Sequence, residues 1–197
     1  TLGEPPTRLL HETIVPEMPA TLEIDGVPVR VVGRALTGSE HPWAGQASFA
    51  DLAETYLRPD AALSPRVRLR FRTPTTFRSQ DRHIPLPLPA LVFGSLLDRW
   101  NNVAPMRLDP HLHDWLAASL VIARYDLSTR LVQLGGGKQV GFVGQCAYTA
   151  RDSEPSMVRQ LGLLAASAFY SGIGHKTTMG MGMARAIESS QSKVPRG

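Results

Sequence analysis

The alternating stretch RVRLRFR, at residues 66–72, constrains the fold of this chain more than any other feature. Successive side chains of an extended strand point to opposite faces, so the three apolar residues would face a core and the four arginines would lie on the other side. These arginines are Arg66, Arg68, Arg70 and Arg72. Aligned cations repel one another, so their face suits solvent or an anionic partner. The stretch predicts a sheet with one buried and one basic face, and leaves open whether solvent or a polyanion lies against the basic one.

The elements that follow are predicted from hydrophobic periodicity and from the positions of glycine and proline. Pro74 cannot donate a hydrogen bond to a neighbouring strand, so TPTTF, at residues 73–77, is expected to leave regular structure. We then expect, in order, a helix from Pro89 to about residue 101, a shorter helix at 113–120, strands at 120–134 and 139–150 joined by GGGK, a helix from Pro155 with Ser153 as N-cap and Gly172 at its end, and a strand within 181–189. Apart from the extra short helix this order is βαββαβ, which predicts an α+β fold with a ferredoxin-like (RRM-like) domain.

The first sixty residues have the pattern of the second half of another such domain. Two strands are expected around the turn signal Asp25-Gly26, followed by a helix at 48–57. An opening strand and helix would be missing, so we expect a truncated domain there. The predicted organisation is a partial N-terminal ferredoxin-like half at residues 1–62, a C-terminal ferredoxin-like domain at 63–190 and a disordered tail at 191–197.

The only cysteine, Cys146, excludes an internal disulfide bond. Nothing therefore requires an oxidising compartment, and a cytoplasmic location is expected. Because Cys146 stands within the apolar stretch VGFVGQCAY, we expect a buried packing residue rather than a nucleophile. No apolar run approaches the length of a bilayer, so no membrane partner is expected.

The basic residues are mostly arginine: of the 21, only Lys138, Lys176 and Lys193 are lysine. The planar guanidinium suits phosphate and stacks on bases, which is compatible with RNA binding. A GC-rich genome would favour arginine in the same way. The net charge of +4 does not decide between the two explanations.

A glycine-rich stretch, SGIGHKTTMGMGMAR, occupies residues 171–185. It is not a P-loop, because His175 separates Gly174 from Lys176 and the stretch leads from a helix to a strand. The Rossmann pattern fails too, because its third glycine would fall at Thr177. Glycines at alternate positions let another backbone come close, and nearby amides, Lys176 and two threonines could bind phosphate. A helix cap followed by a glycine-rich strand beside a bulky neighbour would explain the same pattern.

Four stretches give this chain a resemblance to a known family: SGIGHKTTMGMG, RLRFRTPTTFR, PLPLPALVFGSLLDRWN and VGFVGQCAYTA. The first resembles the glycine-rich loop of the RAMP superfamily of CRISPR systems. The others resemble the CRISPR-associated endoribonuclease that cuts precursor CRISPR RNA within each repeat, over about residues 43–185. The resemblance implies two ferredoxin-like domains in tandem, with RNA held against basic surfaces and the glycine-rich loop. It also implies cleavage without a metal or cofactor, in which a 2′-hydroxyl attacks the adjacent phosphate and leaves a 2′,3′-cyclic end.

Catalytic residues stay unassigned at this point. In the family they commonly lie in the N-terminal domain and often include a histidine, but no motif here matches them. His111 and His113 lack a third ligand nearby, so no metal site is expected. The residues expected to bind RNA are Gly172, Gly174, His175, Lys176, Thr177, Thr178, Gly180, Gly182, Arg68, Arg70, Arg72 and Arg78. His83, near Arg78 and Arg82, could contact RNA as well.

The resemblance implies CRISPR repeat RNA as the partner. Subunits of a CRISPR effector complex and a second copy of the chain are further candidates. Two alternatives to an endoribonuclease remain open: a non-catalytic RAMP subunit that holds guide RNA in an effector complex, and a ferredoxin-like module for protein interaction. Cleavage, salt-sensitive binding or absence of RNA binding would distinguish the three.

Overall fold

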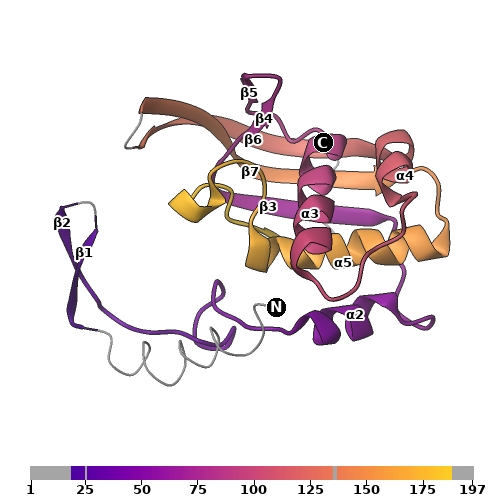
Figure 1. The fold of residues 1–197 in the computed structure, drawn as a ribbon, viewed down its shortest axis with the longest axis horizontal. Helices are drawn as coiled ribbons and strands as arrows, with labels where there is room; N and C mark the ends of the chain where they lie inside the picture. The colour runs from indigo at the N-terminus through magenta and orange to yellow at the C-terminus, as the bar shows by residue number, and fades with distance from the viewer. Residues whose placement is uncertain (1–18, 25, 135–136, 188–197) are drawn as a thin grey trace, which may run out of the picture. The chain divides into compact units, whose positions relative to one another are not determined.

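The computed structural model describes residues 19–187, except for residues 25, 135 and 136 (Figure 1). The chain divides into two compact units, residues 1–46 and residues 47–197. In the described part of the first unit, β1 (Thr21–Ile24) and β2 (Val27–Arg30) form an antiparallel hairpin, which agrees with the two strands expected there. The tail expected at residues 191–197 lies outside the described residues.

The second unit contains a four-stranded antiparallel sheet in the order β6-β7-β3-β8. Its strands are β3 (Arg66–Thr75), β6 (Leu120–Leu134), β7 (Gly137–Ala150) and β8 (Ala184–Ala186). Four α-helices belong to the described part of this unit: α2 (Phe49–Leu57), α3 (Pro89–Val103), α4 (Leu112–Ser119) and α5 (Pro155–Ser171). The helices α3 and α5 cover one face of the sheet, and α2 packs against α5 (Figure 1). The unit is a mixed α+β structure built on an antiparallel sheet.

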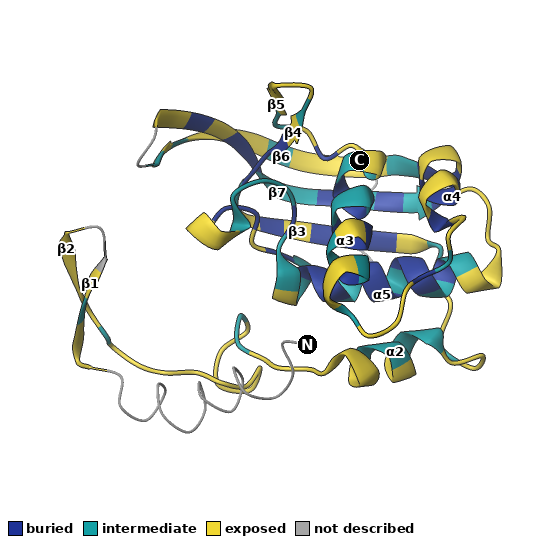
Figure 2. Cartoon of the chain, in the orientation of Figure 1, coloured by how far each residue is buried: buried dark blue, intermediate teal, exposed yellow. Residues whose placement is uncertain are grey.

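The alternation of β3 is confirmed. Val67, Leu69 and Phe71 are buried in the core beneath α3 and α5, where Figure 2 shows the buried residues gathered. The four arginines therefore lie on the opposite face of the sheet, which we call the open face; Arg66, Arg70 and Arg72 are exposed and Arg68 is half-buried. Because side chains alternate between the two faces of a strand and one face packs on the core, the alternating pattern determines which residues are buried.

The expectation that residues 73–77 leave regular structure is wrong. The strand β3 continues to Thr75, which pairs with Phe142 of β7 after an irregularity that follows Phe71. Proline is tolerated at such a bulge because no ladder bond is required of its nitrogen. The carbonyl oxygen of Pro74 accepts a hydrogen bond from the N–H of Gly182 at 3.1 Å. Beyond β3 the chain forms a short hairpin of β4 (Phe77–Ser79) and β5 (Arg82–Ile84), which was not predicted.

The ends of the helices follow local chemistry. As expected, α3 begins at Pro89 and α5 at Pro155, where a missing N–H has no helical partner to lose. The N-cap of α5 is Glu154 rather than the predicted Ser153, because the Glu154 carboxylate accepts the N–H groups of Ser156 and Met157 at 3.1 and 2.8 Å. At the other end, Gly172 closes the helix with a φ of 66°, as expected.

Two further contacts position the helices on the core. The ring of Phe49 in α2 meets Trp100 in α3 edge-on, with centroids 5.4 Å apart, so α2 belongs to the second unit. The hydroxyl of buried Tyr148 donates to the Pro87 carbonyl at 3.0 Å and holds the segment before α3. Cys146 is fully buried, as predicted, and burial raises the pKa of its thiol. The assignment of residues 1–62 to a partial domain of their own stays a prediction.

Among the helices of the described residues, none has the length and apolar character needed to cross a bilayer.

Candidate functional site

The glycine-rich loop runs from Gly172, at the end of α5, to Met183, just before β8. It folds back on itself, since the N–H of Ile173 donates to the carbonyl of Gly182 at 2.8 Å. It also docks on the segment after β3, where the N–H of His175 donates to the carbonyl of Thr76 at 2.8 Å. Ile173 is fully buried and anchors the turn to the core. The loop is therefore a packed structure with a defined backbone.

Two of its glycines are required by close backbone approach. Gly174 has a φ of 84°, and a Cβ there would lie 2.5 Å from the carbonyl oxygen of Thr76. Gly182 has a φ of 71°, and a Cβ there would overlap the carbonyl oxygen of Ile173. A side chain at either position would also have to adopt a left-handed conformation. The expectation that another backbone comes close to this loop is confirmed at both positions.

This packing uses most of the backbone amides that could have met a phosphate. The N–H groups that donate within the protein are those of Gly172, Ile173, Gly174, His175, Met179, Gly180, Met181, Gly182 and Met183. What the loop presents outward is therefore mainly side chains. Lys176 and His175 are half-buried, and Thr178 is exposed.

The loop is held from beneath by an arginine of α3. Arg99 donates from Nη1 to the carbonyl of Ser171 and to the hydroxyl of Thr177, both at 3.0 Å, and from Nη2 to the carbonyl of Gly174 at 2.6 Å. One helical turn earlier, the hydroxyl of Ser95 accepts the N–H of Gly174 at 3.1 Å. Residues four apart share one face of a helix, so two side chains of α3 form hydrogen bonds with the loop.

Arg99 also contributes charge. Its guanidinium is half-buried, and burial lowers its pKa, although an arginine stays protonated at neutral pH. In the described part of the chain, no carboxylate forms an ion pair with it. Sequence reasoning missed Arg99. The spacing of Ser95 and Arg99 on one helical face was visible in the sequence, but the contact with a loop 75 residues further on was not.

Beside the loop lies a groove of about 450 Å³ between α3, β4 and the tip of α4. Its ionisable lining residues are Arg78, Asp98, Arg99, His113 and His175. Two residues predicted from separate parts of the sequence, Arg78 and His175, are thus brought together. Basic groups outnumber the single carboxylate, which favours an anionic ligand.

A second imidazole approaches His175 from the β4–β5 hairpin. The ring of His83 lies with its centroid 5.6 Å from that of His175, and His83 is paired in register with Arg78. The pKa of His175 is lowered by burial first, and then by the nearby charges of His83, Lys176 and Arg78. Arg78 itself forms an exposed ion pair with Asp81 at 2.8 Å.

The other predicted arginines lie on the open face of the sheet. Arg68 and Arg70 face outward there, and the strand register sets Arg70 between Gln145 of β7 and Arg185 of β8. Arg124 of β6 is opposite Ala147, one strand away from Arg68. The structure therefore does not join these arginines to the loop. Arg72 lies nearer to it, since its N–H donates to the carbonyl of Met183 at 2.8 Å.

The predicted residues thus form two sets. The loop set consists of Gly172, Gly174, His175, Lys176, Thr177, Thr178, Gly180 and Gly182, together with Arg78 of β4. Within it, the hydroxyl of Thr177 accepts a hydrogen bond from Arg99, and no atom lies within 4 Å of the position that a side chain at Gly180 would take. The open-face set consists of Arg68 and Arg70, with Arg72 between the two sets.

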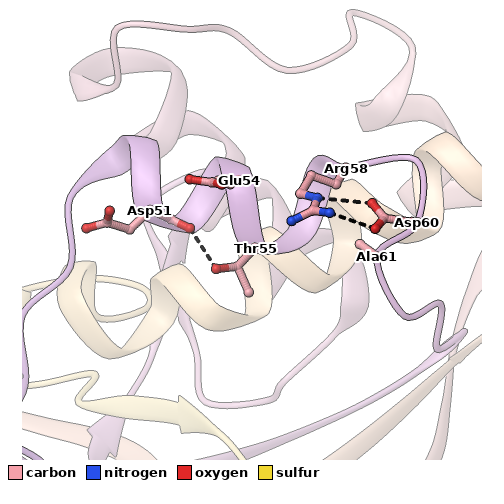
Figure 3. A pocket seen from close by; sticks show the side chains of 6 residues that line it. All are labelled: Asp51, Glu54, Thr55, Arg58, Asp60 and Ala61. Carbon is pink, nitrogen blue, oxygen red and sulfur yellow. Dashed lines mark hydrogen bonds and ion pairs between the residues drawn. The ribbon is translucent and has the colours of Figure 1, made fainter.

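A hollow of about 420 Å³ along α2 has the opposite electrostatic character (Figure 3). Three carboxylates line it, those of Asp51, Glu54 and Asp60, against the single guanidinium of Arg58, which pairs with Asp60 at 2.7 Å. Its net charge disfavours a polyanion. Among the described residues, no three His, Cys, Asp or Glu side chains gather as metal ligands would.

Comparison with known proteins places this chain in a family. The sequence model of the family described as "CRISPR-associated endoribonuclease Cas6" matches residues 69–184. A Cas6 of Mycobacterium tuberculosis is 27% identical over 165 residues, which cover 83% of this chain and 49% of that protein. A Cas6 of Streptococcus thermophilus is 26% identical over 114 residues, covering 57% and 46%. The chain spans about half the length of these curated relatives.

Solved structures agree with this comparison. A Thermus thermophilus Cas6 superposes with a TM-score of 0.74 and 32% identity, over 82% of this chain and 66% of that one. A Cas6 product complex gives a TM-score of 0.76 at 31% identity, over 92% and 69%. A Cas6 substrate mimic complex gives 0.73 at 32% identity, over 90% and 75%. With the family model covering more than half of its residues, the chain belongs to the CRISPR-associated endoribonuclease Cas6 family of RAMP proteins.

Proposed function

We propose that this chain binds CRISPR repeat RNA as part of an endoribonuclease that cuts precursor CRISPR RNA within the repeat. The observation that carries the proposal is a rigid loop surrounded by cations: Arg99 holds it from beneath, Lys176 lies within it, and Arg78 lines the groove beside it. Related Cas6 proteins that share 32% identity with this chain form complexes with a substrate mimic and with a product.

In the proposed reaction, a 2′-hydroxyl attacks the adjacent phosphorus while the bond to the 5′-oxygen of the next nucleotide breaks. A general base takes the proton of the 2′-hydroxyl, and a general acid gives a proton to the departing oxygen. The products are a 2′,3′-cyclic phosphate and a free 5′-hydroxyl. The step conserves protons and is metal-independent, as the resemblance implies.

The part that this chain plays follows from charge and rigidity. Negative charge develops on the phosphoryl oxygens during the attack, and fixed cations stabilise it most when they need not rearrange. The loop satisfies the second condition because the Arg99 hydrogen bonds and the close contact of Gly174 with Thr76 determine its backbone. We assign the loop and groove to holding RNA, and leave the acid and base unassigned.

We also infer that the second unit is a ferredoxin-like domain. If β3, β6, β7 and β8 are numbered first to fourth in chain order, the sheet reads second, third, first, fourth from one edge to the other. Helices follow the first and third of them, which gives the βαββαβ order apart from the additional α4. The open face of such a sheet binds RNA in RRM domains, and here that face carries Arg68 and Arg70.

The test is incubation of the protein with end-labelled repeat RNA in EDTA. Cleavage to a 2′,3′-cyclic end supports the endoribonuclease. Salt-sensitive binding without cleavage supports the alternative, a non-catalytic RAMP subunit of an effector complex. If no RNA is bound at low salt, the proposal fails and a protein-interaction module is the better description.

A further inference from the structure

The feature that the proposed function does not yet explain is the pair of imidazoles beside the loop. Nothing in the described structure employs them: neither ring makes a hydrogen bond or an ion pair there. They come from segments far apart in sequence, yet their centroids lie 5.6 Å apart at a tilt of 44°. A histidine with a purely structural task usually has its ring nitrogens bonded. Two unbonded rings side by side are therefore available to a ligand.

We propose that His83 and His175, together with Arg78, form a phosphate-binding site that takes up a proton from solvent when RNA binds. The proposal rests on the proposed function, since it assigns one phosphate of the bound RNA to this pair. Arg78 stands opposite His83 in the β4–β5 hairpin and lines the same groove as His175. Three groups that can each carry positive charge and donate hydrogen bonds thus converge from two parts of the chain.

The charges around the pair explain why a proton would be taken up. Lys176 adjoins His175 on the loop, Arg99 faces the groove from α3, and His113 faces it from α4. The carboxylates are fewer: Asp98 lines the groove from α3, Asp81 is already paired with Arg78, and Asp114 contacts His113 at 3.3 Å. Protonating His175 in the free protein places one more cation among several. A phosphodiester between the rings removes that penalty because its negative charge compensates the proton.

The sign of the pH dependence follows from linkage. In the free protein the pKa of His175 lies below its ordinary value, because of burial and its cationic neighbours. Bound phosphate raises this pKa. At a pH between the free and the bound pKa, His175 is therefore protonated in the complex but neutral in the free protein, so binding takes up a proton. Affinity therefore rises as pH falls through this window and is flat on either side of it. For one proton the steepest change is about tenfold per pH unit.

The experiment measures the affinity of the wild-type chain for a short 2′-O-methyl oligouridylate at constant ionic strength between about pH 5 and pH 8. This probe carries phosphates but cannot be cleaved, because its 2′-oxygen is blocked. We expect wild-type affinity to rise toward low pH, and His83→Asn and His175→Asn each to abolish most of that rise. Near pH 8 both variants should bind almost as well as the wild type, because neutral rings contribute little.

A histidine outside the groove serves as the control. His111→Gln changes an exposed residue there and should keep the wild-type pH dependence. Because His83 is exposed on a short hairpin, His83→Asn should fold even if His175→Asn does not.

The NMR signals of the ring carbons supply a second readout. The pKa of His175 should rise when the wild-type chain is saturated with the probe. RNA binding with no pH dependence, or with the same dependence in both asparagine variants, overturns this inference and leaves the proposed function standing. Failure of the wild-type chain to bind the probe or repeat RNA at any pH overturns the proposed function instead.

Discussion

The Nη2 atom of Arg99 lies 2.6 Å from the carbonyl oxygen of Gly174, and this contact joins α3 to the glycine-rich loop. The same guanidinium reaches the carbonyl of Ser171 and the hydroxyl of Thr177, so one side chain spans the loop from its first turn to its short 3₁₀ segment. The planar fork of an arginine can serve several acceptors in fixed directions. The conformation of the loop therefore depends on a residue outside it.

Replacing Arg99 by glutamine should loosen the loop and weaken RNA binding. Several charge-assisted hydrogen bonds are lost from a half-buried position, so the free energy of unfolding should fall by about 1–3 kcal/mol. Arg99→Lys keeps the charge but cannot reproduce the fork, so it should recover only part of the affinity. Denaturant unfolding and RNA titration measure the two effects. Arg107→Gln, an exposed change of equal charge, is the control. Full recovery by lysine would show that charge, and not the fork, is what the loop requires.

Gly174→Ala should destabilise the protein more than Gly180→Ala. Both glycines have nearly the same φ, 84° and 83°, so each substitution carries a similar left-handed penalty of about 1 kcal/mol. Only at Gly174 does the new methyl group meet a backbone oxygen, that of Thr76 at 2.5 Å, whereas Gly180 has nothing within 4 Å. Comparing the two unfolding midpoints isolates the overlap. Equal midpoints would mean that the close approach at Gly174 relaxes freely.

Lys176→Ala should weaken the binding of RNA of any sequence and reduce the dependence of this binding on salt. Loss of one phosphate contact lowers the slope of log affinity against log salt by about 1. Arg151→Ala removes the same charge from an exposed residue that follows β7 at the opposite end of the sheet, so it should leave the slope near that of the wild type. A slope unchanged in Lys176→Ala would argue against a phosphate contact at this loop position.

The double change of Arg68 and Arg70 to glutamine tests the open face of the sheet. If RNA crosses this face, the salt slope should fall by about 2. Stability should stay the same or rise slightly, because neighbouring like charges are removed from one face of a strand. A paired change of Arg107 and Arg151 to glutamine supplies the same charge difference away from both sites. If both double variants show the same salt slope, Arg68 and Arg70 do not contact RNA and face only solvent.

Local patterns predicted those parts of the fold that local chemistry decides. The alternation at residues 66–72 determined which face of β3 is buried, and Pro89 and Pro155 marked two helix starts. Predictions failed where a neighbour supplied what the local rule lacked. The strand continues through Pro74 because the bulge there needs no proline N–H and the loop bonds its carbonyl.

By itself the sequence determined the order of the four sheet strands and of α3, α4 and α5, the buried and basic faces of β3, and the glycines that permit close backbone contact. These depend on side-chain period and on conformational preference, which act between near neighbours. Only the tertiary structure decided that Arg99 holds the loop and that His83 lies beside His175. These two contacts join residues 75 and 92 positions apart, whose distance is set by how the helices and strands pack. No local pattern carries that information.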